Sequence, residues 1–328
     1  MASPRPTQAT YGYIDPNFPN PMGQWDTPVI IYGYTPKFAL AVFAVAWFFI
    51  FLVAHSVLTV RNRSWYWTVF PVGLLFEVIG YIARLLSAKQ DPYHLLFFIL
   101  NYFFIVTAPV FLAAGIYTIL SGLITRQNLA RSSNGISRSR ALHSRLPPRA
   151  ILWFFVVSDV VSTITQVAGA ALIGVSYSKR RDPTTANNIL LGGLAYQVFS
   201  MGVFVVLATS YIFSRFRSPP ALRNGEAHET STSFCIAFSV SALAVYLRTC
   251  FRLAETAEGL GGKLQTNEVY FACLEFAPVA LAVLLLAVWH PGKYVGRKIL
   301  AVSANRESAP EVGVESGHGV RKETSPVI

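Results

Sequence analysis

Charged residues are scarce in this chain. Asp, Glu, Lys and Arg together make up 13% of its 328 residues, whereas a typical soluble domain contains about 25%. Hydrophobic residues account for 53%. A soluble fold of this length usually carries far more surface charge, so the deficit favours a protein that is embedded in lipid.

The motifs of several enzyme and cofactor classes are also missing. Three cysteines do not form a disulfide framework or a Cys-rich metal site. Gly261-Gly262-Lys263 is followed by Leu264, so it is not the phosphate loop G-x-x-x-x-G-K-[ST]. No Gly-x-Ser-x-Gly elbow occurs, residues 269–289 hold no lysine for retinal, and most of the six histidines lie outside the apolar runs. We therefore expect no enzyme activity, no cofactor and no metal.

Long apolar runs are what the chain does contain. A bilayer core about 30 Å thick is crossed by about 20 apolar residues in a helix. Seven such runs occupy residues 38–60, 66–86, 95–124, 151–175, 189–213, 234–251 and 269–289. Pro109 near the middle of the third run predicts a tilt or kink. The sequence therefore predicts an all-α polytopic membrane protein, a bundle of seven transmembrane helices.

Lys and Arg are distributed unevenly between the connecting segments. They concentrate in residues 61–65, 125–150, 214–233 and the C-terminal tail. Because cytosolic loops carry an excess of these residues, we predict that these segments face the cytosol and that the N-terminus lies outside. Topology alone explains the net charge of +11, so no nucleic-acid partner is expected. Binding of the basic loops to anionic membrane lipids is the alternative.

Little protein is predicted outside the helices. We divide the chain into an extracellular N-terminal segment (1–35), a membrane domain (36–295) and a disordered cytosolic tail rich in Ser, Glu and Gly (296–328). The N-terminal segment contains Tyr11-Gly12-Tyr13 and a second copy, Tyr32-Gly33-Tyr34. Tyrosines at such places usually lie at the lipid headgroups, so the second copy is predicted to anchor the chain at the interface.

Ionisable and amide side chains interrupt the apolar runs at helical spacing. Such residues are costly inside a membrane and are functional candidates by default. Within the second, fourth and sixth runs their spacing of three, four or seven residues places them on one helix face. The candidate residues are Glu77, Tyr81, Arg84, Asp159, Gln166, Gln197, Arg248, Arg252, Glu255, Glu268 and Glu275.

Depth along each helix separates these candidates into layers. At a rise of about 1.5 Å per residue, most of them fall in the outer half, Glu77 lies just below, and Asp159 lies closer to the cytosol. This predicts a polar pit open to the outside, with a second polar layer beneath it. Two interpretations stay open: ion pairs and hydrogen bonds that hold the bundle together, or a site for the headgroup of an amphiphile.

Two local expectations follow from the same residues. Arg248 and Arg252, at the outer end of the sixth helix, are expected to pair with Glu275 and to close the outer mouth, with the glycine-rich link 256–267 as a hinge. His55, near the inner end of the first run, is expected to be hydrogen-bonded for structural reasons.

Four of these elements resemble a known family. Residues 77–84 are similar to the E-x-I-G-Y-x-x-R element of the fungal RTA-like (resistance to aminocholesterol) family, also called lipid-translocating exporters. Residues 159–166 resemble its D-x-x-S-x-x-x-Q element, residues 193–197 its G-L-x-x-Q element and residues 248–255 its R-x-x-F-R-x-x-E element. The resemblance covers about residues 32–295. Glu275 departs from it, because the family usually has Asp there.

The resemblance implies a seven-span fungal protein that exports or flips sphingoid long-chain bases and confers resistance to toxic amphiphiles. A cationic amphiphile would suit a pit that contains several glutamates. We therefore expect a transporter that exports lipid-like amphiphiles (sphingoid bases, sterol-like or hydrophobic toxic compounds), in the plasma membrane or another endomembrane. The alternative is a seven-helix receptor or sensor for such compounds. Nothing in the sequence indicates an oligomeric state.

Overall fold

The computed structural model describes residues 13–133, 147–178, 182, 184–217, 232–259 and 262–295. Within this part of the chain the structure is helical, and strand pairing is limited to two isolated bridges. The elements are α1 (Phe38–Arg61), the 3₁₀ turn η1 (Trp65–Trp67), α2 (Val69–Lys89), α3 (Leu95–Ser133), α5 (Pro148–Ser178), α6 (Thr184–Phe216), α8 (Thr232–Glu258), α9 (Lys263–Thr266), α10 (Glu268–Tyr270), the π-helical segment η2 (Phe271–Phe276), α11 (Ala277–Val288) and α12 (Pro291–Tyr294).

Seven of the described helical segments are long and apolar enough to cross a membrane. The second joins η1 to α2, and the seventh runs from α10 through η2 and α11 to α12. The prediction of an all-α, seven-helix polytopic membrane protein is therefore confirmed.

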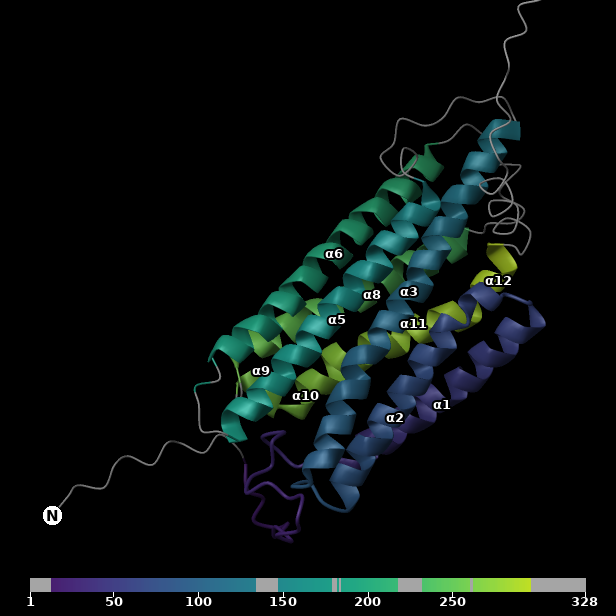
Figure 1. The fold of residues 1–328 in the computed structure, drawn as a ribbon. Helices are drawn as coiled ribbons and strands as arrows, with labels where there is room; N and C mark the ends of the chain where they lie inside the picture. The colour runs from purple at the N-terminus through teal and green to yellow at the C-terminus, as the bar shows by residue number, and fades with distance from the viewer. Residues whose placement is uncertain are drawn as a thin grey trace, which may run out of the picture.

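The spanning helices form a closed ring. Each of α1, α2, α3, α5, α6, α8 and α11 contacts the next, and α11 returns to α1. The 39-residue α3 also contacts α8 across the ring. Figure 1 shows the bundle with the N-terminal segment, drawn in purple, at one end and α12 at the other. We call the first of these the N-terminal end.

The outer surface of the ring is apolar and its interior is partly polar. Phe154, Phe199 and Val206 are each more than half exposed, which would be costly in water over so large an area but suits contact with lipid. Charged and amide side chains are instead buried between the helices. This distribution places the candidate site inside the ring.

Several helices extend beyond the apolar runs from which they were predicted. The sixth run, 234–251, lies within the longer α8, which ends at Glu258. In the part of the helix beyond the run, Arg252 and Glu255 form an ion pair one turn apart, which adds to helix stability. The link 256–267 is partly helical as well, because α9 occupies part of it.

Some predictions concern residues outside the described part. These include the tail 296–328, for which disorder was predicted, residues 134–146 of the basic loop 125–150, residues 218–231 of the loop 214–233, and Gly261 of the expected hinge. Residues 13–35 of the N-terminal segment are described, and they fold against the N-terminal end of the bundle.

Candidate functional site

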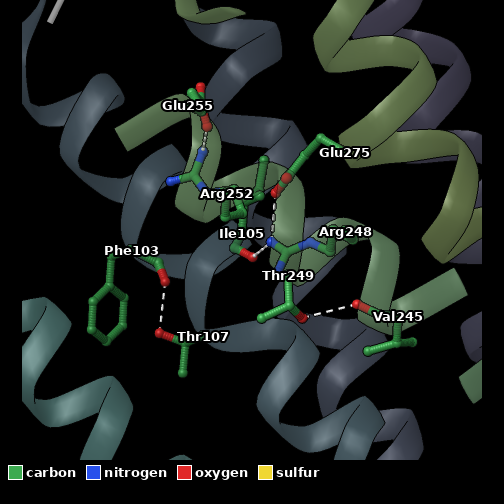
Figure 2. A network of polar contacts seen from close by, with 9 residues as sticks. All are labelled: Phe103, Ile105, Thr107, Val245, Arg248, Thr249, Arg252, Glu255 and Glu275. Carbon is green, nitrogen blue, oxygen red and sulfur yellow. Dashed lines mark hydrogen bonds and ion pairs between the residues drawn. The ribbon is translucent and has the colours of Figure 1, made fainter. Parts of the chain in front are cut away.

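Within the described part of the chain, Arg248 on α8 is the centre of the largest group of buried charges. Its Nη2 atom donates to Glu275 Oε1 at 2.5 Å and to the carbonyl oxygen of Ile105 at 2.7 Å, as Figure 2 shows. The Ile105 carbonyl needs such a donor because Pro109, four residues later, has no N–H with which to complete the helical hydrogen bond. The proline in α3 thus creates the acceptor that positions Arg248.

Glu275 lies in the π-helical segment η2. Pro278 follows at the start of α11 and cannot donate to the α-helical ladder, which helps explain why the irregular turn occurs there. Single π turns often coincide with functional sites because they redirect a side chain. Here the turn carries the carboxylate that faces Arg248.

Arg252 has a different carboxylate partner from the one expected. Its Nη1 lies 2.6 Å from Glu255 Oε2, and its guanidinium lies 5.2 Å from the centroid of the Tyr102 ring on α3. The expected pairing with Glu275 therefore holds for Arg248, whereas Arg252 pairs with Glu255 on its own helix (Figure 2).

Glu77 on α2 completes this group without forming an ion pair of its own. Its side chain is 2% exposed, and Oε1 has no hydrogen-bond partner. Arg248 and Glu275 are its charged neighbours. Gly80 brings α2 against α3 at this depth, since a Cβ there would lie 2.7 Å from Ile105 Cγ1.

We call Glu77, Arg248, Arg252, Glu255 and Glu275 the arginine layer. Two arginines face three carboxyl groups, so one carboxyl has no matching positive charge. The layer is therefore suited to accept one further cation. Tyr81 lies next to it and is packed among aromatic rings, with its centroid 5.4 Å from that of Phe48.

Arg84 on α2 organises a second group at the N-terminal end. Its Nη2 donates to the Tyr34 hydroxyl at 2.6 Å and lies 3.4 Å from Glu268 Oε1. Its guanidinium also lies 4.0 Å from the centroid of the Phe271 ring. Glu268 accepts a further hydrogen bond from the Lys37 N–H at 2.9 Å. We call Tyr32, Tyr34, Arg84, Glu268 and Phe271 the mouth cluster.

The mouth cluster corrects the interpretation of the second Tyr-Gly-Tyr copy. Tyr32 is buried and bonds Ser87 at 3.2 Å, and Tyr34 bonds Arg84. Both rings pack beside a buried guanidinium, which needs acceptors and aromatic faces once it has left water. Burial raises the pKa of the Tyr34 phenol, although the positive charge of Arg84 opposes this. The hydroxyl groups of both tyrosines are therefore engaged by protein side chains, which the interface prediction did not include.

The remaining candidates lie between α3, α5 and α6 and are neutral or hydrogen-bonded to neutral groups. The Tyr117 hydroxyl donates to Asp159 Oδ2 at 2.7 Å, and Gln166 donates to Gln197 Oε1 at 2.8 Å. Ser158 bonds Ser200 at 2.9 Å. We call the whole group the neutral seam; it comprises Tyr117, Ser158, Asp159, Ser162, Gln166, Gln197 and Ser200.

A small cavity adjoins the neutral seam. Its volume is about 10 Å³, room for roughly one water molecule. It is lined by Pro109, Ala113, Tyr117, Asp159, Gln197, Met201, Val245 and Thr249. An amphiphile headgroup does not fit there without movement of the surrounding side chains or helices.

Three contacts of the candidate site were not predicted from the sequence. The Ile105 carbonyl could have been found, because a proline always frees the carbonyl four residues earlier. Tyr34 and Tyr117 have no local signal, since their partners are distant in sequence.

His55 is hydrogen-bonded as expected: its Nε2 lies 3.1 Å from the Val283 carbonyl oxygen. Among the described residues, no cluster of His, Cys, Asp and Glu could hold a metal ion.

The fold and the buried polar groups define a multi-pass membrane protein whose ring of seven helices encloses charged and amide side chains. A family model described as "RTA1 like protein" matches residues 70–298, which is more than half of the chain. The chain therefore belongs to the RTA1-like family.

Three relatives from Saccharomyces cerevisiae illustrate the similarity. The sphingoid long-chain base transporter RSB1 is 29% identical over 294 residues, which cover 79% of this chain and 73% of that protein. Protein RTM1 is 25% identical over 256 residues (78% and 76%), and Protein RTA1 is 24% identical over 292 residues (80% and 84%). No solved structure matches the chain.

Proposed function

We propose that this chain is a translocator that exports lipid-like amphiphiles with a cationic headgroup, and that it thereby confers tolerance to them. Sphingoid long-chain bases are the leading substrates, with sterol-like amines and other hydrophobic toxic compounds as further candidates. The protein acts at the plasma membrane, is not an enzyme, and moves its substrates from the cytosolic leaflet outward.

The unmatched carboxyl of the arginine layer carries this proposal. A carboxylate that is buried without a cation is unfavourable, because neither water nor a counter-charge stabilises it. Glu77 has an oxygen with no partner, and it lies beside Arg248 and Glu275. The ammonium group of a sphingoid base would supply the missing charge. The name of the relative RSB1, a sphingoid long-chain base transporter, supports the same substrate class.

The arrangement of polar groups supports translocation in preference to a single surface pocket. Polar groups occur at several places inside the ring, in the mouth cluster, in the arginine layer and in the neutral seam. We propose that the headgroup passes these groups in turn while the alkyl chain stays against the apolar outer surface. Competition of the headgroup for Glu275 would release Arg248 and open the path.

Substitution of Glu77 tests the function and the site together. Glu77→Gln keeps the shape of the side chain but removes the charge, so it should reach the membrane normally and lose export. The control is Asp182→Asn, which changes an exposed carboxyl at the start of α6. Both variants and the wild type would be expressed in cells that are sensitive to sphingoid bases, and efflux of a labelled base would be measured.

The outcomes of this experiment separate the alternatives. The proposal expects efflux with the wild type and Asp182→Asn, and efflux near the empty-vector level with Glu77→Gln. Normal efflux by Glu77→Gln would show that Glu77 does not bind substrate. Cells that respond to the base without any increase in efflux would instead indicate a receptor or sensor.

The orientation in the membrane is part of the proposal. The distribution of Lys and Arg supports an N-terminus outside and a cytosolic C-terminal tail, which places the mouth cluster at the outer surface. A tag after residue 5 should be accessible in intact cells, and a tag at residue 320 should become accessible only after permeabilisation. An exposed C-terminal tag in intact cells would reverse the direction of transport that we propose.

A further inference from the structure

Asp159 is a second buried carboxyl without a positive partner, and it lies apart from the arginine layer. Its side chain is 1% exposed. The Tyr117 hydroxyl donates to Oδ2 at 2.7 Å, and Oδ1 has no hydrogen-bond partner. Within the described part of the chain no arginine, lysine or histidine forms an ion pair with it. The group therefore has one oxygen that is satisfied and one that is not.

The elements packed around Asp159 supply no counter-charge. From α3 the ionisable side chain that faces it is Tyr117, which is neutral. From α6 the cavity beside Asp159 is lined by Gln197 and Met201, and from α8 by Val245 and Thr249. None of these four titrates. A carboxylate in such surroundings is unfavourable, so the neutral acid is the stable form when no cation is near.

The cavity links this carboxyl to the arginine layer. Asp159 lines one side of it, and Thr249, the residue after Arg248, lines another. Pro109, which frees the Ile105 carbonyl for Arg248, is a third lining residue. The cavity has room for about one water molecule, and a water molecule there would be able to accept a proton from the Asp159 carboxyl. A cation that enters at this point is close to both polar groups.

We propose that Asp159 holds a proton in the amphiphile-free protein and releases it when a cationic headgroup enters, so that export exchanges one amphiphile cation for one proton. The O–H bond of the acid breaks, its electron pair stays on the carboxylate, and the proton passes through the cavity water to the cytosol. The ammonium group then neutralises the carboxylate. Protonation of Asp159 from the outside reverses this step and ejects the amphiphile. The inference rests on the proposed function.

The test measures how amphiphile binding depends on pH. The purified full-length chain would be placed in nanodiscs and titrated with an N-trimethyl analogue of a sphingoid base. This probe carries a permanent charge, so any linked proton must come from the protein. If each cation displaces one proton, the Kd falls by up to tenfold for each unit of pH increase. A pH dye in weak buffer should report about one proton released for each bound cation.

Asp159→Asn is the decisive variant because its amide has the shape of the protonated acid and can still accept from Tyr117. Its Kd should be independent of pH, and it should release no proton. Asp182→Asn should behave as the wild type. If Asp159→Asn does not accumulate, Tyr117→Phe replaces it. This variant keeps the carboxyl but removes the hydrogen-bond donor that favours its charged form. The pH range over which the Kd changes steeply should therefore move to higher pH.

The possible results separate the proton exchange from the amphiphile site on which it depends. Binding by the wild type without pH dependence or proton release would refute the exchange and leave the amphiphile site intact. The dependence of the Kd on pH could also persist in Asp159→Asn or stay at the same pH in Tyr117→Phe. Either result would assign the proton to a carboxyl of the arginine layer and overturn the role of Asp159. Failure of the wild type to bind the probe at any pH would remove the proposed function and this inference together.

Discussion

The arginine layer and the neutral seam solve the same problem in different ways. Both bury polar side chains inside a membrane bundle, where neither lipid nor bulk water can satisfy them. The arginine layer joins α2, α8 and η2 through charges, and its central contact is Arg248 with Glu275. The neutral seam joins α3, α5 and α6 through hydroxyl and amide hydrogen bonds.

The two groups differ in how much stability is lost when one of their contacts is removed. Hydrogen bonds between membrane helices average about 0.6 kcal/mol, since the separated helices also find partners. Removing one member of a buried ion pair costs about 3–5 kcal/mol, because it leaves the other charge alone. We therefore expect substitutions in the arginine layer to lower stability strongly, and substitutions of the hydroxyl and amide contacts of the neutral seam to be tolerated.

The largest effect is expected from Arg248→Ala. This change would leave the Glu275 carboxylate and the Ile105 carbonyl without their donor, and a loss of about 3–5 kcal/mol should greatly reduce the yield of folded protein. Thermal unfolding in detergent, followed by size-exclusion chromatography, measures it. Stability close to that of the wild type would contradict the sensitivity expected of the arginine layer.

The double variant Arg248→Gln with Glu275→Gln separates stability from function. It removes both charges and keeps two groups that can hydrogen-bond, so folded protein should return to much of the wild-type level. Export should stay absent, because the headgroup has no Glu275 carboxylate for which to compete. Recovery of both expression and export would show that the pair is structural, and the opening mechanism would be wrong.

The fold was largely predictable from the sequence because the length of an apolar run directly reflects the thickness of a bilayer. The ends of the helices were not, because hydropathy counts Arg252 and Glu255 as unfavourable and does not see that they pair. The Arg248–Glu275 contact was anticipated from two charged helix faces. The environment of Tyr34 was missed, since tyrosine near a membrane helix usually indicates the interface and its partner Arg84 is 50 residues away.

A smaller effect is expected at the mouth cluster. Tyr34→Phe removes the acceptor that lies 2.6 Å from Arg84 but keeps the ring. A hydrogen bond to a charged group contributes about 1.5–3 kcal/mol, and part of this remains because Glu268 still contacts Arg84. The N-terminal segment should open more often, so hydrogen–deuterium exchange of residues 30–37 should become faster. Unchanged exchange would show that Tyr34 does not hold the segment closed.

The smallest effect is expected from Ser200→Ala in the neutral seam. Ser158 then loses its partner at 2.9 Å, but a serine hydroxyl in a helix can turn to a backbone carbonyl four residues earlier. The loss should therefore be about 0.6 kcal/mol or less, visible as a small decrease in the midpoint of thermal unfolding, with export close to the wild-type rate. This variant is the sharpest check on the comparison, because it removes a fully buried interhelical contact without changing any charge. A loss as large as that of Arg248→Ala would show that dense packing, and not charge, makes a contact important in this bundle. The tolerance attributed to the neutral seam would then have to be abandoned.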